Sequence, residues 1–344
     1  MRIHDQRSRR LAERLAREIE GEVLFDVASR GRYATDASFY QIMPAGVVVP
    51  RRQEDLDAIV ALAREEGVAL LPRGGGTSQS GQTVGDALVV DCSKYLDGLL
   101  AFDAEARTCT VEPGIVLDEL NRRIAKSGLW FPVDVSTKSR ATIGGMAGNN
   151  SCGTRSIRYG VMRDNVLAID AILADGSQAR FAGVGPGDLD TNIPDSAREI
   201  FRDLLMLGEQ ERDVLESAYP KTARRVGGYN LDALVPGGGA VNLATLLVGS
   251  EGTLALSRRL DLKLARQPRN KALGICHFPT FRRAMEATAA IVGLGPVAVE
   301  VVDRTLLELG RDIPMFRPVM ERYVQGSPDA LLLTEFAEED QVEN

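Results

Sequence analysis

The feature that most constrains this chain is a glycine-rich segment that directly follows an apolar strand pattern. Residues 68–71 are apolar, and residues 72–82 read Pro-Arg-Gly-Gly-Gly-Thr-Ser-Gln-Ser-Gly-Gln. Consecutive glycines leave backbone N–H groups free of side-chain obstruction, so this segment can turn its amides toward an anion such as a diphosphate. It lacks the Gly-Lys-Ser/Thr ending of the mononucleotide P-loop and the GxGxxG spacing of the Rossmann fingerprint. A flexible surface loop is the alternative interpretation of this segment alone.

A second run of small residues favours one extended ligand over two unrelated loops. Residues 141–153 read Ala-Thr-Ile-Gly-Gly-Met-Ala-Gly-Asn-Asn-Ser-Cys-Gly, within a stretch from 132 to 160 that we expect to be irregular. Tyr159 and Gly160 follow, and a strand pattern at 165–173 could then present a rigid backbone edge to a planar ring. These residues together predict a dinucleotide ligand, while a nucleotide other than a flavin stays open at this point.

Apolar periodicity along the chain predicts an α+β fold. Helices are expected at 8–20, 54–66, 116–127 and 196–217, and strands at 47–50, 68–71, 87–91, 108–112, 166–173, 178–181 and 243–248. From about residue 264 a second α+β pattern begins, with strands at 272–277, 297–301 and 330–336, helices at 280–292 and 305–309, and an acidic tail. We therefore expect an N-terminal helix or arm over 1–29, one domain over 30–263 and an incomplete second domain over 264–344.

Composition excludes several classes of function. The formal net charge is −7, without the positive excess that binds nucleic-acid backbones, so no nucleic-acid partner is expected. The four cysteines stand far apart with no CxxC pair, which predicts free thiols in a reducing compartment and no metal site. No apolar stretch approaches the roughly 20 residues of a membrane span, and the N-terminus lacks the apolar core of a secretion signal. We expect a cytoplasmic protein.

An ordered series of motifs resembles a known family. The chain resembles the FAD-linked oxidases of the vanillyl-alcohol oxidase and p-cresol methylhydroxylase type, most closely their glycolate oxidase, D-lactate dehydrogenase and D-2-hydroxyglutarate dehydrogenase branch. The motifs lie at residues 33–38, 44–50, 72–78, 112–114, 141–145, 159–160, 228–231 and 249–253. The resemblance spans roughly residues 30 to 336. It implies a two-subdomain FAD-binding domain of the p-cresol methylhydroxylase (PCMH) type, followed by the start of a ferredoxin-like α+β cap domain.

The resemblance also implies how the cofactor is held. In the family the first glycine-rich loop wraps the FAD pyrophosphate, residues matching 142–153 run past the pyrophosphate and isoalloxazine, and the strand near Ile169 meets the adenine. Members with covalent FAD often use a histidine in the first loop, where this chain has glycines, so noncovalent FAD is implied. The implied cofactor contacts are Pro72, Arg73, Gly74, Gly75, Gly76, Thr77, Ser78, Gln82, Pro132, Ser136, Thr142, Gly144, Gly145, Gly148, Asn149, Ser151, Gly153, Tyr159, Ile169, Glu251 and Gly252.

On the substrate side, the resemblance implies a dehydrogenase that oxidises a small D-2-hydroxy acid, such as D-lactate, glycolate or D-2-hydroxyglutarate, by hydride transfer to flavin N5. Arg224 matches a family lysine and is the candidate for binding the substrate carboxylate, although Arg225 replaces the usual asparagine. The alternative for Arg224 and Arg225 is a solvated surface pair. The electron acceptor is expected to be a partner protein or a quinone, and an acceptor in the membrane would place the protein at the membrane surface.

The family's C-terminal histidine-containing motif has no counterpart, because only His4 and His277 occur. The chain therefore looks truncated, and a second chain could supply the missing part of the cap. The alternative function is a flavin-binding module without turnover of its own. For Glu300 and Asp303 a structural role is favoured over catalysis, and for His277 a local hydrogen-bond partner is favoured over a role as base. Gly75→Asp is expected to abolish FAD retention by placing a carboxylate against the diphosphate.

Overall fold

The computed structural model describes residues 2–185, 188–191, 193, 195–222, 224–237 and 239–338. The acidic tail that the sequence predicts after residue 338 lies outside the described residues. The chain divides into two compact units, and each is described by itself. The first unit comprises Met1–Phe131, Val135–Ser151 and Val161–Ala265, and the second comprises Pro132–Asp134, Cys152–Gly160 and Arg266–Asn344. Two short segments predicted to lie in the FAD-binding domain, around residues 132–134 and 152–160, thus group with the C-terminal part.

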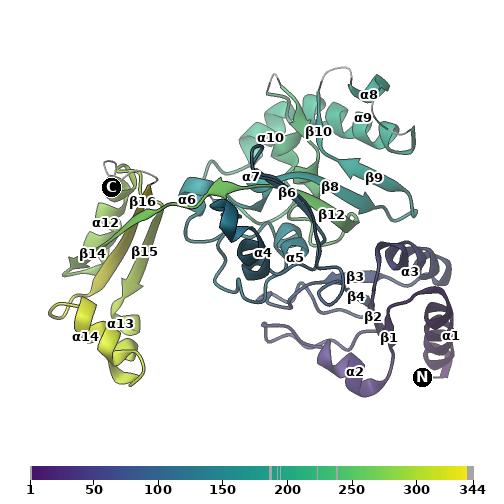
Figure 1. Ribbon diagram of the computed structural model, residues 1–344, viewed down its shortest axis with the longest axis horizontal. Helices are drawn as coiled ribbons and strands as arrows, with labels where there is room; N and C mark the ends of the chain where they lie inside the picture. Colours follow the sequence, from purple (N-terminus) through teal and green to yellow (C-terminus); the bar gives the residue numbers. More distant parts are fainter. Residues whose placement is uncertain are drawn as a thin grey trace. The chain divides into compact units, whose positions relative to one another are not determined.

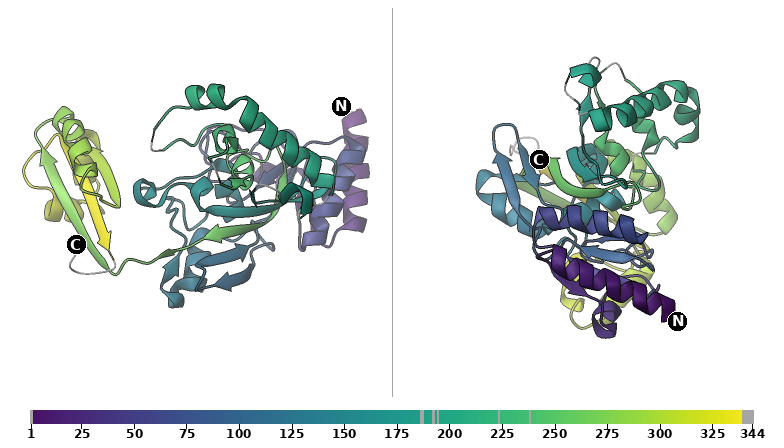
Figure 2. Two further views of the ribbon diagram at one scale, coloured as in Figure 1. Left: turned by 90° about the horizontal axis from the view of Figure 1, so that it is seen from above. Right: turned by 90° about the vertical axis from the view of Figure 1, so that its right-hand side faces the viewer.

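A four-stranded sheet begins the first unit. Its order is β1-β2-β4-β3, where β1 is Glu22–Leu24, β2 Gly46–Val49, β3 Leu70–Arg73 and β4 Leu88–Asp91. Strands β2 and β3 both run parallel to β4, because helix α3 (Gln53–Glu66) carries the chain back between them. Helix α1 (Arg2–Glu18) lies beside α3 (Figure 2), and the two helices close a core that includes Leu15, Leu56 and Leu88.

A five-stranded antiparallel sheet forms the rest of this unit's framework (Figure 1). Its order is β5-β6-β12-β8-β9, where β5 is Leu99–Asp103, β6 Thr108–Val111, β8 Val166–Ile172, β9 Gln178–Phe181 and β12 Leu256–Lys263. The strands predicted at 166–173 and 178–181 are β8 and β9, which form a hairpin, and Gly176 adopts the left-handed φ of +85° that the tight turn between them requires. Helix α9 (Asp195–Gln210) packs on β9 through an edge-to-face contact between Phe181 and Phe201.

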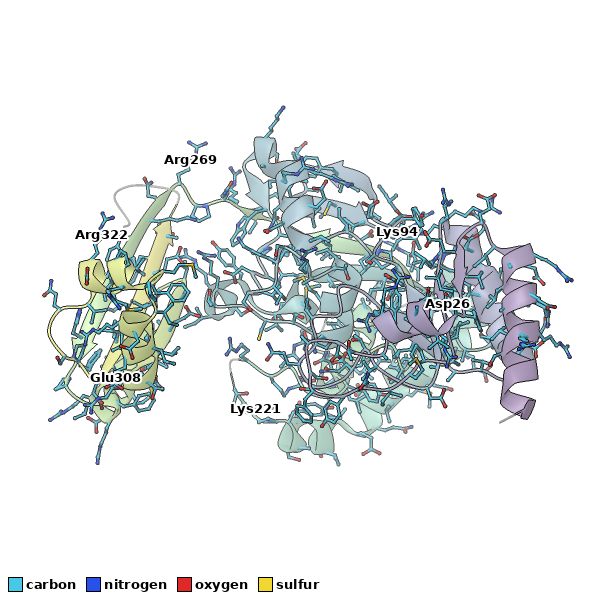
Figure 3. All side chains as sticks on the ribbon, turned by 90° about the horizontal axis from the view of Figure 1, so that it is seen from below. Asp26, Lys94, Lys221, Arg269, Glu308 and Arg322 are labelled. Carbon is cyan, nitrogen blue, oxygen red and sulfur yellow. The ribbon has the colours of Figure 1, made fainter. Side chains whose placement is uncertain are left out.

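Shorter elements complete the first unit. They are α2 (Val27–Arg32), α4 (Leu117–Ile124), η1 (Ala125–Ser127), β7 (Leu129–Trp130), α5 (Ile143–Asn149), α7 (Met162–Asn165), β10 (Gly183–Val184), α8 (Asp188–Thr191), α10 (Arg212–Ala218), η2 (Leu231–Leu234), β11 (Val241–Asn242) and α11 (Ala244–Leu247), and β13 (Ala265–Arg266) follows at the junction. Charged side chains such as Asp26 and Lys94 lie on the surface (Figure 3). Among the described residues, no helix combines the length and apolarity needed to cross a bilayer.

Two local predictions are wrong. The apolar run 243–248 was expected to be a strand, but it forms helix α11, whose four residues are all buried. A helix that is buried on every side shows no polar face, so its sequence cannot be distinguished from that of a buried strand. The stretch 132–160 was expected to be irregular, but it contains α5 and, in the second unit, α6 (Ser156–Tyr159). Helix α5 is not apparent from the sequence, because its three glycines lower the intrinsic helix propensity.

The second unit is a small α+β layer pair. Its antiparallel sheet has the order β14-β16-β15, where β14 is Asn270–Phe278, β15 Ala298–Asp303 and β16 Ala330–Glu338. Helix α12 (Phe281–Val292) covers one face, with Ala284 packed against Ala330 and Leu332. Helices α13 (Arg304–Asp312) and α14 (Arg317–Tyr323) follow β15. Asp303 caps α13 by accepting a hydrogen bond from the Leu306 N–H at 2.9 Å, which is the structural role expected for it.

Candidate functional site

The two glycine-rich loops lie directly against each other. A Cβ atom on Gly74 would stand 2.1 Å from Thr142 Oγ1, and one on Gly75 would stand 2.3 Å from the carbonyl oxygen of Arg140. Real Cβ atoms do not approach other atoms this closely, so only glycine permits the contact between the first loop and the residues that begin the second. The structure therefore brings together the two segments that the sequence predicted to share one ligand.

The first loop exposes a run of backbone donors. In the part of the chain that the structure describes, no hydrogen bond is donated by the amide N–H of Gly75, Gly76, Thr77 or Ser78. Gly76 has a left-handed φ of +63°, which turns the chain between these amides. Consecutive amides without an internal partner, on a half-buried loop, suit the diphosphate of a dinucleotide. On this observation the residues present fit FAD.

The Arg73 guanidinium contacts three backbone carbonyl groups. It donates hydrogen bonds to the carbonyl oxygens of Thr35 (2.8 Å), Thr83 (3.1 Å) and Tyr33 (3.3 Å), and it stacks over the Tyr33 ring. Burial lowers its pKa, while the guanidinium stays charged at neutral pH. Its side chain therefore fixes the end of β3 and the segment 33–37 against each other.

The second loop is held at the start of α5. Thr142 is 1% exposed, and its Oγ1 accepts a hydrogen bond from the Gly145 N–H at 3.2 Å. Gly144 packs on Pro113 so closely that an added Cβ would lie 2.6 Å from the proline Cβ, and its N–H donates to Pro113 O at 2.8 Å. Gly145 stays exposed. Gly144 thus permits close packing on Pro113, whereas Gly145 leaves the backbone of the first turn of α5 exposed.

A third predicted segment, residues 249–252, meets both loops. The Gly249 and Glu251 N–H groups donate to Ala147 O at 2.8 Å and Gly148 O at 2.9 Å, at the C-terminal end of α5. A Cβ on Gly252 would stand 2.9 Å from Pro72 Cγ. The Glu251 carboxylate accepts a hydrogen bond from Asn149 Nδ2 at 3.0 Å. Burial raises the pKa of Glu251, and hydrogen bonds from Asn149 and Gln82 oppose that rise.

Three further predicted cofactor contacts, Ser136, Ser151 and Ile169, lie in different parts of the first unit. Ser151 donates through its hydroxyl to Asn149 Oδ1 at 3.1 Å, and Ser136 is exposed in a turn. Ile169 is 1% exposed in the middle of β8, paired with Leu260 and Phe181 on its two sides. Its backbone is therefore part of the sheet ladder, and only a ligand at the sheet's surface could approach this strand.

Pro132, Gly153 and Tyr159 belong to the second unit. There Arg155 bridges Asp134 at 2.6 Å and Glu335 of β16 at 2.8 Å, and a Cβ on Gly153 would stand 2.3 Å from Asp134 Oδ1. Burial raises the pKa of Tyr159. The segment that carries Gly153 and Tyr159 is thus anchored to the sheet of the second unit, which nothing in the local sequence indicated.

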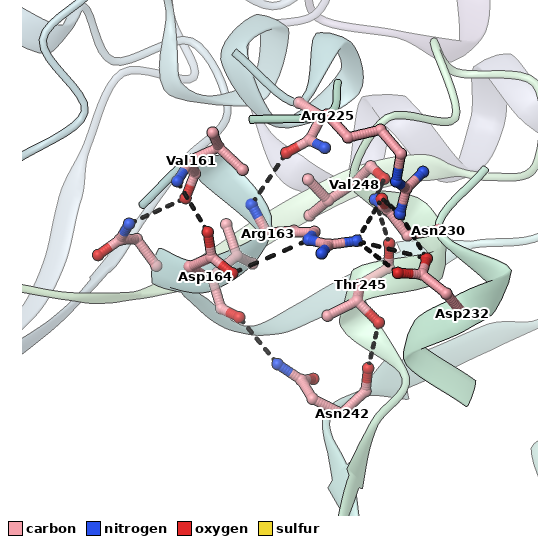
Figure 4. A network of polar contacts seen from close by, with 12 residues as sticks. Val161, Arg163, Asp164, Arg225, Asn230, Asp232, Asn242, Thr245 and Val248 are labelled. Carbon is pink, nitrogen blue, oxygen red and sulfur yellow. Dashed lines mark hydrogen bonds and ion pairs between the residues drawn. The ribbon is translucent and has the colours of Figure 1, made fainter. Parts of the chain in front are cut away.

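The family segment around Arg224 forms a polar cluster that the sequence did not reveal. Arg225 is 11% exposed in its side chain and pairs with Asp232, which also binds Arg163 at 3.1 Å. Figure 4 shows both guanidinium groups turned toward Asp232 and Asn230. Asn230 is fully buried and donates to Val248 O at 2.7 Å and Thr245 O at 3.1 Å. Arg225 therefore has a structural partner in Asp232. The neighbouring Arg224 lies at an exposed position.

A polar pocket of about 180 Å³ lies beside this cluster in the first unit. Its lining includes Arg163, Arg225, Lys221, Asp164 and Asp232. Asp232 engages the two arginines, whereas Lys221 lies at the surface (Figure 3). Because the arginines of the lining are paired with Asp232, their charge is balanced within the protein, and the pocket does not present an excess of positive charge suited to an anion.

His277 is occupied by its neighbours in the second unit. Its Nδ1 contacts Ile275 O at 3.0 Å, and its Nε2 accepts a hydrogen bond from the Gln325 N–H at 3.0 Å. Both ring nitrogens therefore serve local structure, as the sequence analysis expected. Among the described residues, no group of three histidine, cysteine or acidic side chains is arranged to hold a metal ion.

Comparison with known families matches two regions of the chain. Residues 44–182 match a family described as FAD binding domain, and residues 267–344 match one described as FAD linked oxidases, C-terminal domain. The first match contains both glycine-rich loops, and the second covers most of the second unit.

Curated relatives align with most of this chain. The D-2-hydroxyglutarate dehydrogenase of Pseudomonas putida is 31% identical over 314 residues, which are 90% of this chain and 31% of the relative. Glycolate oxidase subunit GlcD of Bacillus subtilis is 28% identical over 84% of this chain and 53% of the relative. The D-lactate dehydrogenase of Archaeoglobus fulgidus is 29% identical over 86% and 55%. The chain thus spans about a third to about half the length of these relatives.

Solved structures show the same fold. An alkyldihydroxyacetonephosphate synthase superposes with a TM-score of 0.70 at 18% identity, over 97% of this chain and 57% of that protein. At such identity the likeness concerns the architecture alone.

Proposed function

The chain belongs to the FAD-linked oxidases, and from this premise we propose that it oxidises a small D-2-hydroxy acid with noncovalently bound FAD. FAD is the cofactor of this family. The observation that carries the proposal is the contact between the two glycine-rich loops, with four consecutive amides that have no partner among the described residues. Relatives named for D-2-hydroxyglutarate, glycolate and D-lactate support the substrate class.

The residues of this chain would bind and orient FAD and the substrate, and they would not themselves perform the redox chemistry. FAD, when bound, supplies the acceptor for a hydride. The amides of residues 75–78 would bind its diphosphate. Thr142, Gly144 and Gly145 would keep the second loop close enough to bind the same group. The other implied cofactor contacts are part of this proposal, with Arg73 acting through its backbone.

On the substrate side we propose Arg224 as the group that binds the carboxylate. Arg224 is exposed in the segment that matches the family motif. An arginine can take a carboxylate in bidentate fashion, which orients the hydroxyl-bearing carbon. The electron acceptor would be a partner protein or a quinone. A cytoplasmic location stays a prediction from the sequence.

A second function, flavin binding without turnover, is favoured by one specific observation. His277 has both ring nitrogens engaged by backbone groups, so it offers no base for the hydroxyl proton. In that case a second chain or a longer polypeptide would supply the missing groups.

One experiment separates these possibilities. The purified chain is expected to carry flavin that acid precipitation releases. Its visible absorption is followed under anaerobic D-lactate, glycolate or D-2-hydroxyglutarate, with L-lactate and L-2-hydroxyglutarate as controls. Bleaching by glycolate, or by D-lactate or D-2-hydroxyglutarate but not its L-form, supports oxidation. Flavin colour that no acid bleaches supports the binding module, and protein that takes up no FAD rules out both.

A further inference from the structure

We propose that Tyr229 is a positioning residue that fixes the segment carrying Arg224 to the turn at residues 250–253, by donating a hydrogen bond to Thr253. The inference rests on the proposed function, because it concerns how the candidate substrate segment is placed relative to the loops of the candidate FAD site. It assigns a role to a residue for which the family resemblance implied none.

The hydroxyl of Tyr229 lies at hydrogen-bonding distance from the hydroxyl of Thr253. The two oxygen atoms are 2.8 Å apart. The Thr253 hydroxyl donates to the carbonyl oxygen of Ser250 at 2.6 Å. Because a hydroxyl carries only one proton, Tyr229 is the donor in the bond to Thr253. The phenol is therefore connected, through Thr253, to the backbone of the turn.

Further contacts bring the same two segments together. Asn230 is fully buried next to Tyr229, and its Nδ2 donates to Val248 O at 2.7 Å. A Cβ on Gly249 would stand 3.3 Å from Gly228 O. The side chain of Tyr229, at a position that is 41% exposed, extends this contact from the buried Asn230 to the exposed end of the turn.

On its other side Tyr229 is joined to the segment that carries the arginines. The Tyr219 hydroxyl donates to Tyr229 O at 2.8 Å, and the Arg225 guanidinium stacks on the Tyr219 ring, 4.3 Å from its centroid. Arg225 directly follows Arg224, the candidate for binding the substrate carboxylate. A connected series of contacts therefore runs from the Arg224 segment through the two tyrosines to Thr253.

The turn at 250–253 is itself fixed to both glycine-rich loops. The Glu251 N–H donates to Gly148 O at 2.9 Å, at the end of α5, and Gly252 packs on Pro72, at the end of β3. A residue bonded to this turn is therefore placed relative to the backbone that would bind the dinucleotide. Through the Tyr229 hydroxyl, the position of the Arg224 segment depends on the same backbone.

The test is limited trypsin digestion of the full chain, because Lys221 and Arg224 are exposed cleavage sites in this segment. Cleavage of a folded protein needs local opening, so its rate reports how firmly the segment is held. Tyr229→Phe removes only the hydroxyl. It is expected to raise the rate of cleavage after Lys221 and Arg224 about fivefold, as for loss of one hydrogen bond. Mass spectrometry of the fragments measures the rate at each site.

Thr253→Val removes the acceptor and is expected to raise the cleavage rate at least as much, whereas Thr253→Ser keeps a hydroxyl and should behave as wild type does. The double variant Tyr229→Phe/Thr253→Val should be cleaved no faster than Thr253→Val, because both changes remove one bond. The matched control is Tyr323→Phe in the second unit, at a position that is 44% exposed, and it should leave the rate unchanged. Multiplied effects in the double variant, or an unchanged rate in Tyr229→Phe, would overturn the role of Tyr229.

FAD provides a measurement that a purely structural role would not change. Saturating FAD is expected to slow cleavage after Arg224 in wild type, because the ligand holds the loops and the turn together. Tyr229→Phe should retain flavin but lose most of this protection. Equal protection in both proteins, or none in wild type with FAD bound, would contradict the placement of the segment through Tyr229. Wild-type protein that binds no FAD would instead overturn the proposed function, and the variants without FAD would still decide whether Tyr229 holds the segment.

Discussion

Gly75 shows at the scale of one residue why the first loop must be glycine. The sequence suggested that a side chain there would collide with the diphosphate, but the structure gives another reason, because a Cβ would lie 2.3 Å from Arg140 O. We therefore expect Gly75→Ala, and not only Gly75→Asp, to separate the loops. Unfolding free energy should fall by about 1–3 kcal/mol, the usual cost of overpacking, and flavin content should fall with it.

The control for this prediction is Gly31→Ala, since an added Cβ at Gly31 meets no atom within 4 Å. Urea unfolding and the ratio of flavin to protein measure the two effects. Full flavin content and unchanged stability in Gly75→Ala would show that the loops are not in contact as described.

At the scale of elements, Asp232 connects three parts of the first unit. It lies in η2, and it pairs with Arg163 of α7 and with Arg225. Asp232→Asn keeps the shape of the side chain but leaves two guanidinium groups without their carboxylate. Because the site is partly exposed, we expect a loss of about 1–2 kcal/mol in unfolding free energy.

Asp86→Asn, at an exposed position, is the control for Asp232→Asn and should leave stability within about 0.5 kcal/mol of wild type. Chemical denaturation followed by circular dichroism measures both variants. Equal stability of the two variants would show that the arginines find other partners and that Asp232 does not hold the cluster together.

At the scale of the whole molecule, the described residues include one hydrophobic cluster around Leu15, Leu56 and Leu88 in the first unit and another around Ala284 and Leu332 in the second. A ligand that binds the folded state stabilises it by mass action, by about 2.7 kcal/mol at a hundredfold excess over Kd. We expect added FAD to raise the Tm of the first unit in calorimetry, increasingly with concentration. Riboflavin lacks the diphosphate and should raise it much less, because the loop amides are proposed to bind that group. An equal shift by riboflavin would contradict the diphosphate role of residues 75–78.

Much of the fold was predictable from local patterns. The helix at 53–66, strands β8 and β9 and the three strands of the second unit all follow from periodicity and turn residues within a few positions. The family was equally readable, because its motifs are short, ordered and rich in glycine, a residue whose placement reports on backbone geometry.

The sequence by itself determined that two glycine-rich loops exist and which family they belong to. Only the tertiary structure decided that 243–248 is a buried helix, that Arg225 pairs with Asp232, and that Glu251 accepts a hydrogen bond from Asn149. The physical reason is the distance along the chain between the residues that interact. A helix period or a turn depends on neighbours a few residues away, whereas Asn149 and Glu251 are brought together only when α5 and the turn after α11 pack, across more than 100 residues of chain.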